Sequence, residues 1–192
     1  MHVLDTIIRP GRWSFLRLAA VVGLALAVFG LAAAPQARAD TPIGSQWQVR
    51  DAVQPFGTDV HPGYQYKLWN LENQNMLIHK GQRWGIDLDF VPDPKNGYEG
   101  IKFERQTGTG PLKFGERFAI YVVGGGYLRY EDHSTVANLG YSPTPVYEWK
   151  VTGAPSGTSV KTGLAMGLYN TRAAGYLYHF FQVFGINLNF TY

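Results

Sequence analysis

The sequence contains no cysteine, so disulfide bonds, thiol nucleophiles and cysteine-ligated metals are all excluded. A folded domain must therefore rely on its hydrophobic core for stability. Helical spacing of apolar residues is also missing after residue 40. Residues 40–192 are long enough for a single domain with one sizeable core.

Excess charge is missing from the same region. Four of the seventeen Lys and Arg residues and one of the fourteen Asp and Glu residues lie in positions 1–39, so residues 40–192 carry thirteen of each. A neutral chain without a block of Lys or Arg lacks the electrostatic footprint of a nucleic-acid-binding protein. Nucleic acid is therefore not an expected partner.

Sequence motifs of common catalytic sites are few. There is no Gly-x-Ser-x-Gly segment of the kind that presents a serine nucleophile. Gly124-Gly125-Gly126 lies between strand-like segments, whereas a phosphate-binding loop opens a helix, so a hairpin turn is the better interpretation. No cofactor is expected, and the balance favours a protein that is not an enzyme.

The first 39 residues have the pattern of an export signal. The basic residues at its start are Arg9, Arg12 and Arg17. An apolar run from Leu18 to Ala34 follows, and Ala37-Arg38-Ala39 supplies the small-x-small pattern of a cleavage site before Asp40. We expect a signal peptide at 1–39 and a secreted or extracytoplasmic, bacterial location. The alternative is an uncleaved anchor, which would make the membrane a partner through this segment alone.

Two segments one hundred positions apart match without a gap. Leu68–Phe90 and Leu168–Phe190 are identical at nine of twenty-three positions. The identical pairs are Leu68/Leu168, Asn70/Asn170, Leu77/Leu177, His79/His179, Gln82/Gln182, Gly85/Gly185, Ile86/Ile186, Leu88/Leu188 and Phe90/Phe190. A match of this kind indicates a repeated structural unit.

Apolar residues alternate within the repeat, which is typical of strands. Trp84, Ile86, Leu88 and Phe90 share one face of the first copy. Gly- and Pro-rich turns interrupt the chain at hairpin spacing. The pattern predicts an all-β barrel or sandwich in residues 40–192.

A weaker middle copy lies between the two. Phe118–His133 places a Gly-rich turn before Tyr127-Leu128, and Val146–Val151 then occupies the place of the strands that begin at Trp84 and Phe184. The expected units are about 50–92, 98–152 and 155–192. Three such units suggest a β-trefoil-like barrel, the alternative being another small β-barrel or sandwich.

The segment Gln82-Arg83-Trp84 resembles the Gln-x-Trp signature of ricin-B-like β-trefoil lectins. Gln182-Val183-Phe184 is a softened copy, and Tyr147-Glu148-Trp149 stands in the middle unit with a different first residue. This resemblance implies a secreted, non-catalytic module that recognises carbohydrate.

An aromatic residue beside an amide recurs in the two best copies, as Trp69-Asn70 and Tyr169-Asn170. Sugar rings stack on aromatic side chains while amides hold their hydroxyl groups. We therefore expect Trp69, Asn70, Tyr169 and Asn170 to bind a glycan or cell-surface ligand. The alternative is that the aromatic residues simply pack in a β-rich core.

Other functions stay open at this point. A secreted protein-interaction module, an inhibitor or a host-surface ligand, would use Ser134–Thr144 as its contact loop. A glycoside hydrolase would use Asp87 and Asp89, whose carboxyl groups should lie about 7 Å apart along a strand face. The second copy has Asn187 and Asn189 at these positions, which favours a requirement for polarity rather than for proton transfer.

His79 and His179 occupy the same position of the two copies, with Tyr130 in the middle one. If all three converge near a barrel axis, the imidazoles could bind zinc or a similar cation. The more ordinary expectation is that each histidine hydrogen-bonds a neighbour, so no metal site is predicted.

Overall fold

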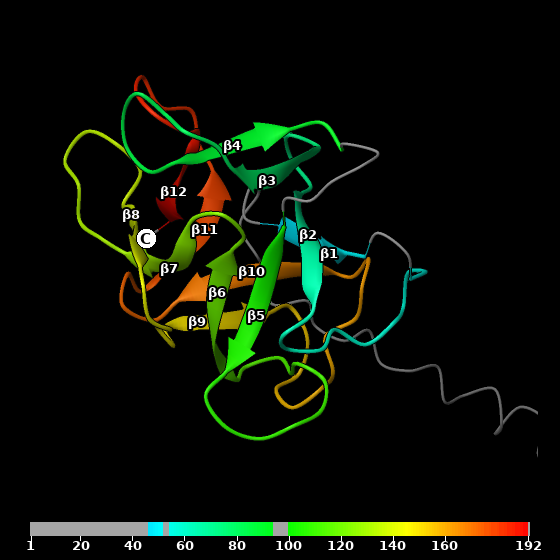
Figure 1. Ribbon diagram of the computed structural model, residues 1–192. Helices are drawn as coiled ribbons and strands as arrows, with labels where there is room; N and C mark the ends of the chain where they lie inside the picture. Colours follow the sequence, from blue (N-terminus) through cyan, green and yellow to red (C-terminus); the bar gives the residue numbers. More distant parts are fainter. Residues whose placement is uncertain (1–45, 52–53, 94–99, 192) are drawn as a thin grey trace, which may run out of the picture. The chain divides into compact units, whose positions relative to one another are not determined.

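A computed structural model describes residues 46–51, 54–93 and 100–191, and the expected signal segment lies outside these residues. The described residues form twelve β-strands and no helix, which confirms the all-β prediction (Figure 1). Among them there is consequently no helix long and apolar enough to cross a membrane. The strands are β1 (Gln46–Arg50), β2 (Gln65–Asn70), β3 (Asn75–His79), β4 (Leu88–Val91), β5 (Ile101–Arg105), β6 (Arg117–Val122), β7 (Gly126–Tyr130), β8 (Leu139–Ser142), β9 (Trp149–Thr152), β10 (Ala165–Asn170), β11 (Gly175–His179) and β12 (Leu188–Thr191).

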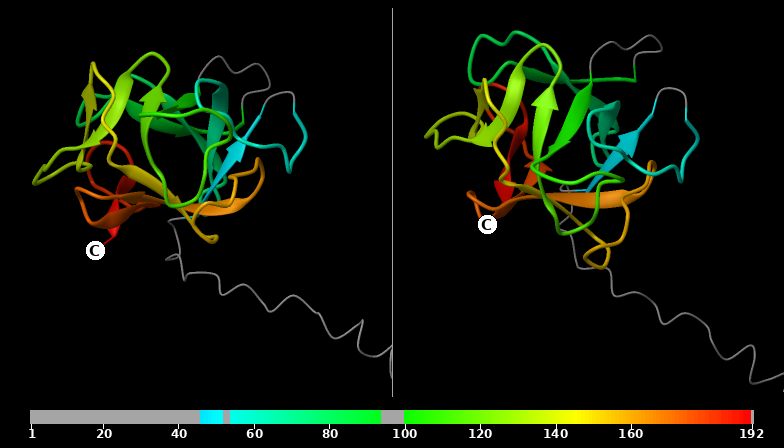
Figure 2. Two further views of the ribbon diagram at one scale, coloured as in Figure 1. Left: turned by 90° about the horizontal axis from the view of Figure 1, so that it is seen from below. Right: turned by 60° about the horizontal axis from the view of Figure 1, so that its bottom comes forward.

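Six strands pair antiparallel into a closed ring. The ring runs β1, β2, β5, β6, β9 and β10, and β10 returns to β1 (Figure 2). Side chains alternate between the two faces of these strands. In β9, for example, buried and half-buried residues alternate along the strand. Closing the ring leaves no free edge in this part of the sheet.

The other six strands form hairpins attached to the ring. β3–β4 extends from β2, β7–β8 from β6, and β11–β12 from β10. Their registers match, because His79 pairs with Leu88, Tyr130 with Leu139 and His179 with Leu188. The connecting loops, 80–87, 131–138 and 180–187, are therefore equal in length.

The prediction that Val146–Val151 occupies the place of the strands that begin at Trp84 and Phe184 is wrong. Trp149–Thr152 is strand β9, which pairs with β10 and β6 in the ring. The partner of β7 is Leu139–Ser142, strand β8. Glycine and serine are poor strand residues, so the sequence of β8 carries little strand signal and its pairing with β7 decides its conformation.

The core fills the ring and the space beneath the hairpins. Its largest fully buried side chains include Trp47, Trp149, Phe103, Phe114 and Phe118. Each buried indole is hydrogen-bonded: Trp47 Nε1 donates to the Leu177 carbonyl at 2.9 Å, and Trp149 Nε1 donates to the Leu128 carbonyl at 2.8 Å. These bonds join ring strands to the bases of two hairpins.

Candidate ligand-binding site

Each hairpin loop is braced by one Asp or Asn side chain. The Oδ1 atoms of Asp87, Asn138 and Asn187 accept hydrogen bonds from backbone N–H groups five residues earlier in the chain. The bonds are Gln82 N to Asp87 at 2.8 Å, His133 N to Asn138 at 2.8 Å and Gln182 N to Asn187 at 3.0 Å. Only an acceptor oxygen is required here, and Asp and Asn both supply one.

Two residues later, the first and third hairpins again have an Asp or Asn whose side-chain oxygen accepts a backbone hydrogen bond. Asp89 Oδ1 accepts the Phe90 N–H at 2.8 Å, and Asn189 Oδ1 accepts the Phe190 N–H at 2.9 Å. Asp89 also pairs with Lys80 at 2.6 Å. Both carboxylates of the candidate hydrolase pair thus have structural partners, which explains why Asp and Asn exchange between the copies.

Replacing Asp87 with Asn should leave the stability nearly unchanged, because Asn138 and Asn187 make the same brace. Replacing Asp87 with Ala removes the acceptor of the Gln82 N–H and should lower the free energy of unfolding by about 1–2 kcal/mol. Urea unfolding followed by far-UV circular dichroism would compare the two variants. Equal losses for Asn and Ala would contradict the brace.

The three braced loops meet at one end of the molecule. A Cβ on Gly185, which has φ of +77°, would lie 3.0 Å from the Trp84 carbonyl oxygen, and one on Gly85 would lie 3.3 Å from the Val136 Cβ. The rings of Trp84 and Phe184 meet edge to face, with centroids 6.3 Å apart. Loop 80–87 is thus packed against both of the other loops (Figure 1).

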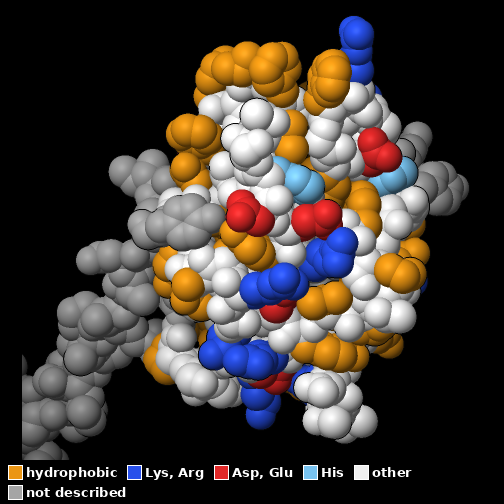
Figure 3. All heavy atoms as spheres, turned by 90° about the vertical axis from the view of Figure 1, so that its left-hand side faces the viewer, with side chains coloured by type: hydrophobic (Ala, Val, Ile, Leu, Met, Phe, Trp, Pro, Cys, Tyr) orange, Lys and Arg blue, Asp and Glu red, His pale blue; other side chains and the backbone are white. Residues whose placement is uncertain are grey.

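Large apolar side chains are exposed on two of these loops. They are Trp84, Phe180, Phe181, Val183 and Phe184, with Phe181 74% exposed and Val183 79% exposed. Figure 3 shows hydrophobic side chains gathered at the upper end of one face, where loops 80–87 and 180–187 lie in Figure 1. Contiguous apolar surface of this kind is typical of an interaction site.

A hollow of about 520 Å³ lies between loops 131–138 and 180–187, and we call it the loop hollow. Phe180, Phe181 and Phe184 supply its aromatic lining. Its polar lining comprises His133, Ser134, Thr135, Asn138, Gln182 and Asn189. A volume of this size lies within the usual range for small-ligand sites.

Three side-chain amides of the loop hollow each use one polar atom for a hydrogen bond to the backbone. Asn138 and Asn189 use Oδ1 for the backbone bonds given above, and Gln182 Nε2 donates to the Leu188 carbonyl at 2.8 Å. The second polar atom of each amide, Nδ2 or Oε1, has no partner in the part of the chain that the structure describes. The result is a set of oriented donors and acceptors left open beside aromatic rings.

A second hollow, of about 420 Å³, lies on the other side of loop 131–138, against loop 80–87. Tyr141 lines it, and its hydroxyl donates to the Asp87 carbonyl at 3.0 Å. Burial, and then the charge of Asp87, raises the pKa of the Tyr141 hydroxyl, so the hydroxyl keeps its proton. This bond connects β8 to loop 80–87 and helps to hold the first two hairpins together.

Asn70 and Asn170, two of the predicted ligand-binding residues, are completely buried. Asn70 Oδ1 accepts the N–H groups of Glu72 and Asn73 at 3.0 and 3.1 Å. Asn170 Oδ1 accepts those of Arg172 and Ala173, both at 2.9 Å. The structure gives both amides a role in shaping the turns after β2 and β10, and neither faces solvent.

The aromatic partners of these amides are half-buried on the outside of the ring. The Arg50 guanidinium lies 3.9 Å from the centre of the Trp69 ring. Tyr169 meets Tyr176 edge to face, with centroids 5.2 Å apart. Protein groups therefore lie beside both rings, and the expectation that these four residues bind a ligand stays a prediction.

His79 and His179 lie against different neighbours. His79 packs on Tyr141 with ring centroids 6.1 Å apart, and His179 packs edge to face on Phe90 at 5.6 Å. Tyr130 packs similarly on Phe190 at 5.7 Å. Each residue thus fastens its own hairpin to another one, and the described residues contain no cluster of three or more His, Asp or Glu suited to a metal ion.

Comparisons with protein-family models, with curated proteins and with solved structures found no match. The resemblance to ricin-B-like lectins therefore stays a prediction. Its three motifs occupy unlike places, since Trp84 and Phe184 are exposed on loops whereas Trp149 is fully buried in β9. Sequence reasoning missed the loop hollow, although Phe180-Phe181 followed by Val183-Phe184 is an unusually apolar run for a hairpin loop.

Proposed function

We propose that the described domain is a β-trefoil of three four-stranded units, β1–β4, β5–β8 and β9–β12. In support, each unit contributes two strands to the ring and one hairpin, with the same pairing between them. Equal loop lengths and the Asp87, Asn138 and Asn187 braces support it further. The unit boundaries then fall before β1, β5 and β9, earlier than the sequence suggested for the first and third units.

The function we propose is that of an exported, non-catalytic module that binds carbohydrate in the loop hollow. The observation that carries the proposal is the pairing of exposed phenylalanine rings with amides that keep one polar atom open. A sugar has an apolar C–H face and a rim of hydroxyl groups, so it needs both surfaces at once. Amides that are already oriented lose little entropy on binding.

A protein partner is the second candidate, and one observation favours it. Trp84 is 56% exposed and does not line the loop hollow, so the apolar surface extends beyond what a small sugar would cover. An apolar centre with a polar rim is typical of protein interfaces. A protein partner would gain most from the aromatic rings and little from the open amide atoms.

A glycan array probed with the full-length chain tests the proposal. The informative variant is Asn138→Asp with Asn189→Asp, since it keeps both Oδ1 acceptors and removes both Nδ2 donors. Asp87 and Asp89 occupy the same positions in the first hairpin, so the fold should tolerate the change. We expect the double variant, and Phe181→Ala separately, to weaken glycan binding at least tenfold, equivalent to about 1.4 kcal/mol.

Phe56→Ala is the matched control, because Phe56 is 68% exposed and does not line the loop hollow. It should bind the same glycans as the unchanged protein. Absence of saturable binding to any glycan, or binding that the two Asn→Asp changes leave intact, would reject a carbohydrate site here. The first outcome would leave the protein partner as the candidate function.

A further inference from the structure

A third hollow, with a polar lining, lies beside the connection between β5 and β6, away from the three hairpin loops in sequence. Its volume is about 420 Å³, and we call it the basic hollow. The lining side chains include Arg105, Lys113, Arg117, Glu116, Thr107 and Thr109. Three cations and one carboxylate leave it with an excess of positive charge, whereas residues 40–192 as a whole carry equal numbers of basic and acidic residues.

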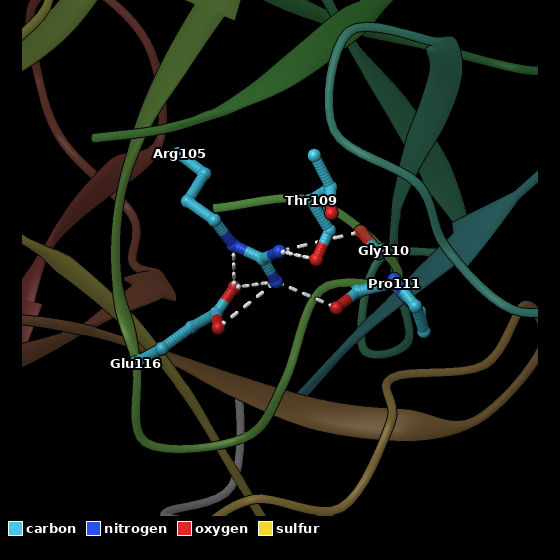
Figure 4. A network of polar contacts seen from close by, with 5 residues as sticks. All are labelled: Arg105, Thr109, Gly110, Pro111 and Glu116. Atoms are coloured by element: carbon cyan, nitrogen blue, oxygen red, sulfur yellow. Dashed lines mark hydrogen bonds and ion pairs between the residues drawn. The ribbon is translucent and has the colours of Figure 1, made fainter. Parts of the chain in front are cut away.

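The guanidinium of Arg105 organises the loop at this hollow (Figure 4). It forms a bidentate pair with Glu116, with Nη2 2.8 and 3.0 Å from the two carboxylate oxygens. It also donates to the carbonyls of Thr109 at 2.7 Å and of Pro111 at 2.6 Å. Arg105 thus neutralises Glu116 and draws the loop carbonyls toward itself.

The backbone N–H groups of the same loop are left open. From Thr107 to Gly110, no backbone N–H has an acceptor within the described ranges. Gly108 and Gly110 adopt φ of +88° and +91°, the left-handed conformation that glycine permits. Successive free N–H groups in a turn of this kind form a concave site for anions.

Two cations of the basic hollow also lack a counter-charge. Neither Lys113 nor Arg117 makes an ion pair with any described residue. Arg117 lies directly opposite Lys150 in the β6–β9 pair, where like charges repel. A bound anion would relieve this repulsion, and Arg and Lys side chains are the usual binders of oxyanions.

We propose that the basic hollow binds a sulfate or phosphate group. Lys113 and Arg117 supply the charge, and the loop amides of Thr107–Gly110 with the threonine hydroxyls supply further donors. Arg105 acts as a positioning residue, because Glu116 already neutralises it. The proposal stands apart from the carbohydrate site, since no residue lines both hollows.

Titration of the full-length chain with sodium sulfate and sodium phosphate, at constant ionic strength set with sodium chloride, tests this site. In ¹H–¹⁵N NMR spectra the amide signals of residues 107–110 should shift and saturate. The double variant Lys113→Gln/Arg117→Gln should weaken binding at least tenfold. Arg117→Gln alone should weaken it by less, and serves if the double variant is unstable.

The matched control is Lys67→Gln/Lys161→Gln, which removes the same charge from lysines paired with Asp93 and Asp59. It should change the affinity less than twofold. Shifts that rise linearly without saturation, or equal weakening in both double variants, would overturn the site. N-acetylglucosamine 6-sulfate compared with unsulfated N-acetylglucosamine and free sulfate then separates the two sources: tighter binding of the ester indicates a sulfated glycan, and equal binding of ester and sulfate indicates the free ion.

Discussion

Replacing Asn170 with Ala should lower the free energy of unfolding by about 3 kcal/mol. Three hydrogen bonds end on this buried amide: two backbone N–H donors reach its Oδ1, and its Nδ2 donates to Glu148 Oε1 at 2.9 Å. Glu148 is only 7% exposed. Because Ala173 and Glu148 are buried, their groups cannot bond to water instead, and each of these two lost bonds costs about 1–3 kcal/mol, with partial relief as the turn relaxes.

Urea unfolding followed by far-UV circular dichroism would measure the effect. Asn73→Ala is a suitable control, since Asn73 is half-buried in the matching turn between β2 and β3 and its Oδ1 accepts one backbone bond, from Asn75 at 2.9 Å. Asn73→Ala should lower the free energy of unfolding by less than about 1 kcal/mol. A similar small loss for Asn170→Ala would show that the turn after β10 does not depend on the amide.

The two outer hairpins could be predicted from the sequence because their pattern is local. His79 and His179 share a strand position in the gapless match, and the structure pairs them with Leu88 and Leu188 in the same register. The sequence predicts the same register for Leu128 and Tyr130, since the Gly-rich turn marks the start of β7, and β7 pairs with β8 in this way. Periodicity and turn residues are sufficient for such assignments.

The middle hairpin shows where local pattern fails. At the position of Asn70 and Asn170, β6 has Val122, and the following turn is closed by the Gly125 N–H donating to the Val122 carbonyl at 3.0 Å. Glycine makes this turn without a side-chain amide. The sequence therefore lacks the repeated asparagine here, and the later strand β8 could not be recognised by likeness.

The candidate site could not be predicted from local sequence patterns, for a different reason. The loop hollow is formed by residues about fifty positions apart, and its amides matter through the one atom that the fold leaves open. The sequence shows that Asn70 and Asn170 recur. A recurring asparagine is compatible with two roles, because an amide can shape a buried turn or bind a ligand at the surface. Only the arrangement in space separates a turn-forming amide from one that faces a ligand.

Replacing Trp149 with Phe should lower the free energy of unfolding by about 2–3 kcal/mol. The indole N–H is the donor to the Leu128 carbonyl, which lies in the buried base of the β7–β8 hairpin. Phenylalanine removes this donor and leaves space in a closely packed core beside Phe190, whose ring centroid is 5.9 Å away. The exposed Trp84 provides the same substitution without these consequences.

Trp84→Phe should change the stability by less than about 0.5 kcal/mol, because its ring is 56% exposed and contacts Phe184 at the surface. Far-UV circular dichroism is the appropriate readout, since both changes remove a fluorescent indole. Comparable losses for the two variants would mean that the contact of Trp84 with the third loop contributes to folding as much as the core bond does. The exposed loop end would then be a structural brace, and the case for a ligand-binding surface there would weaken.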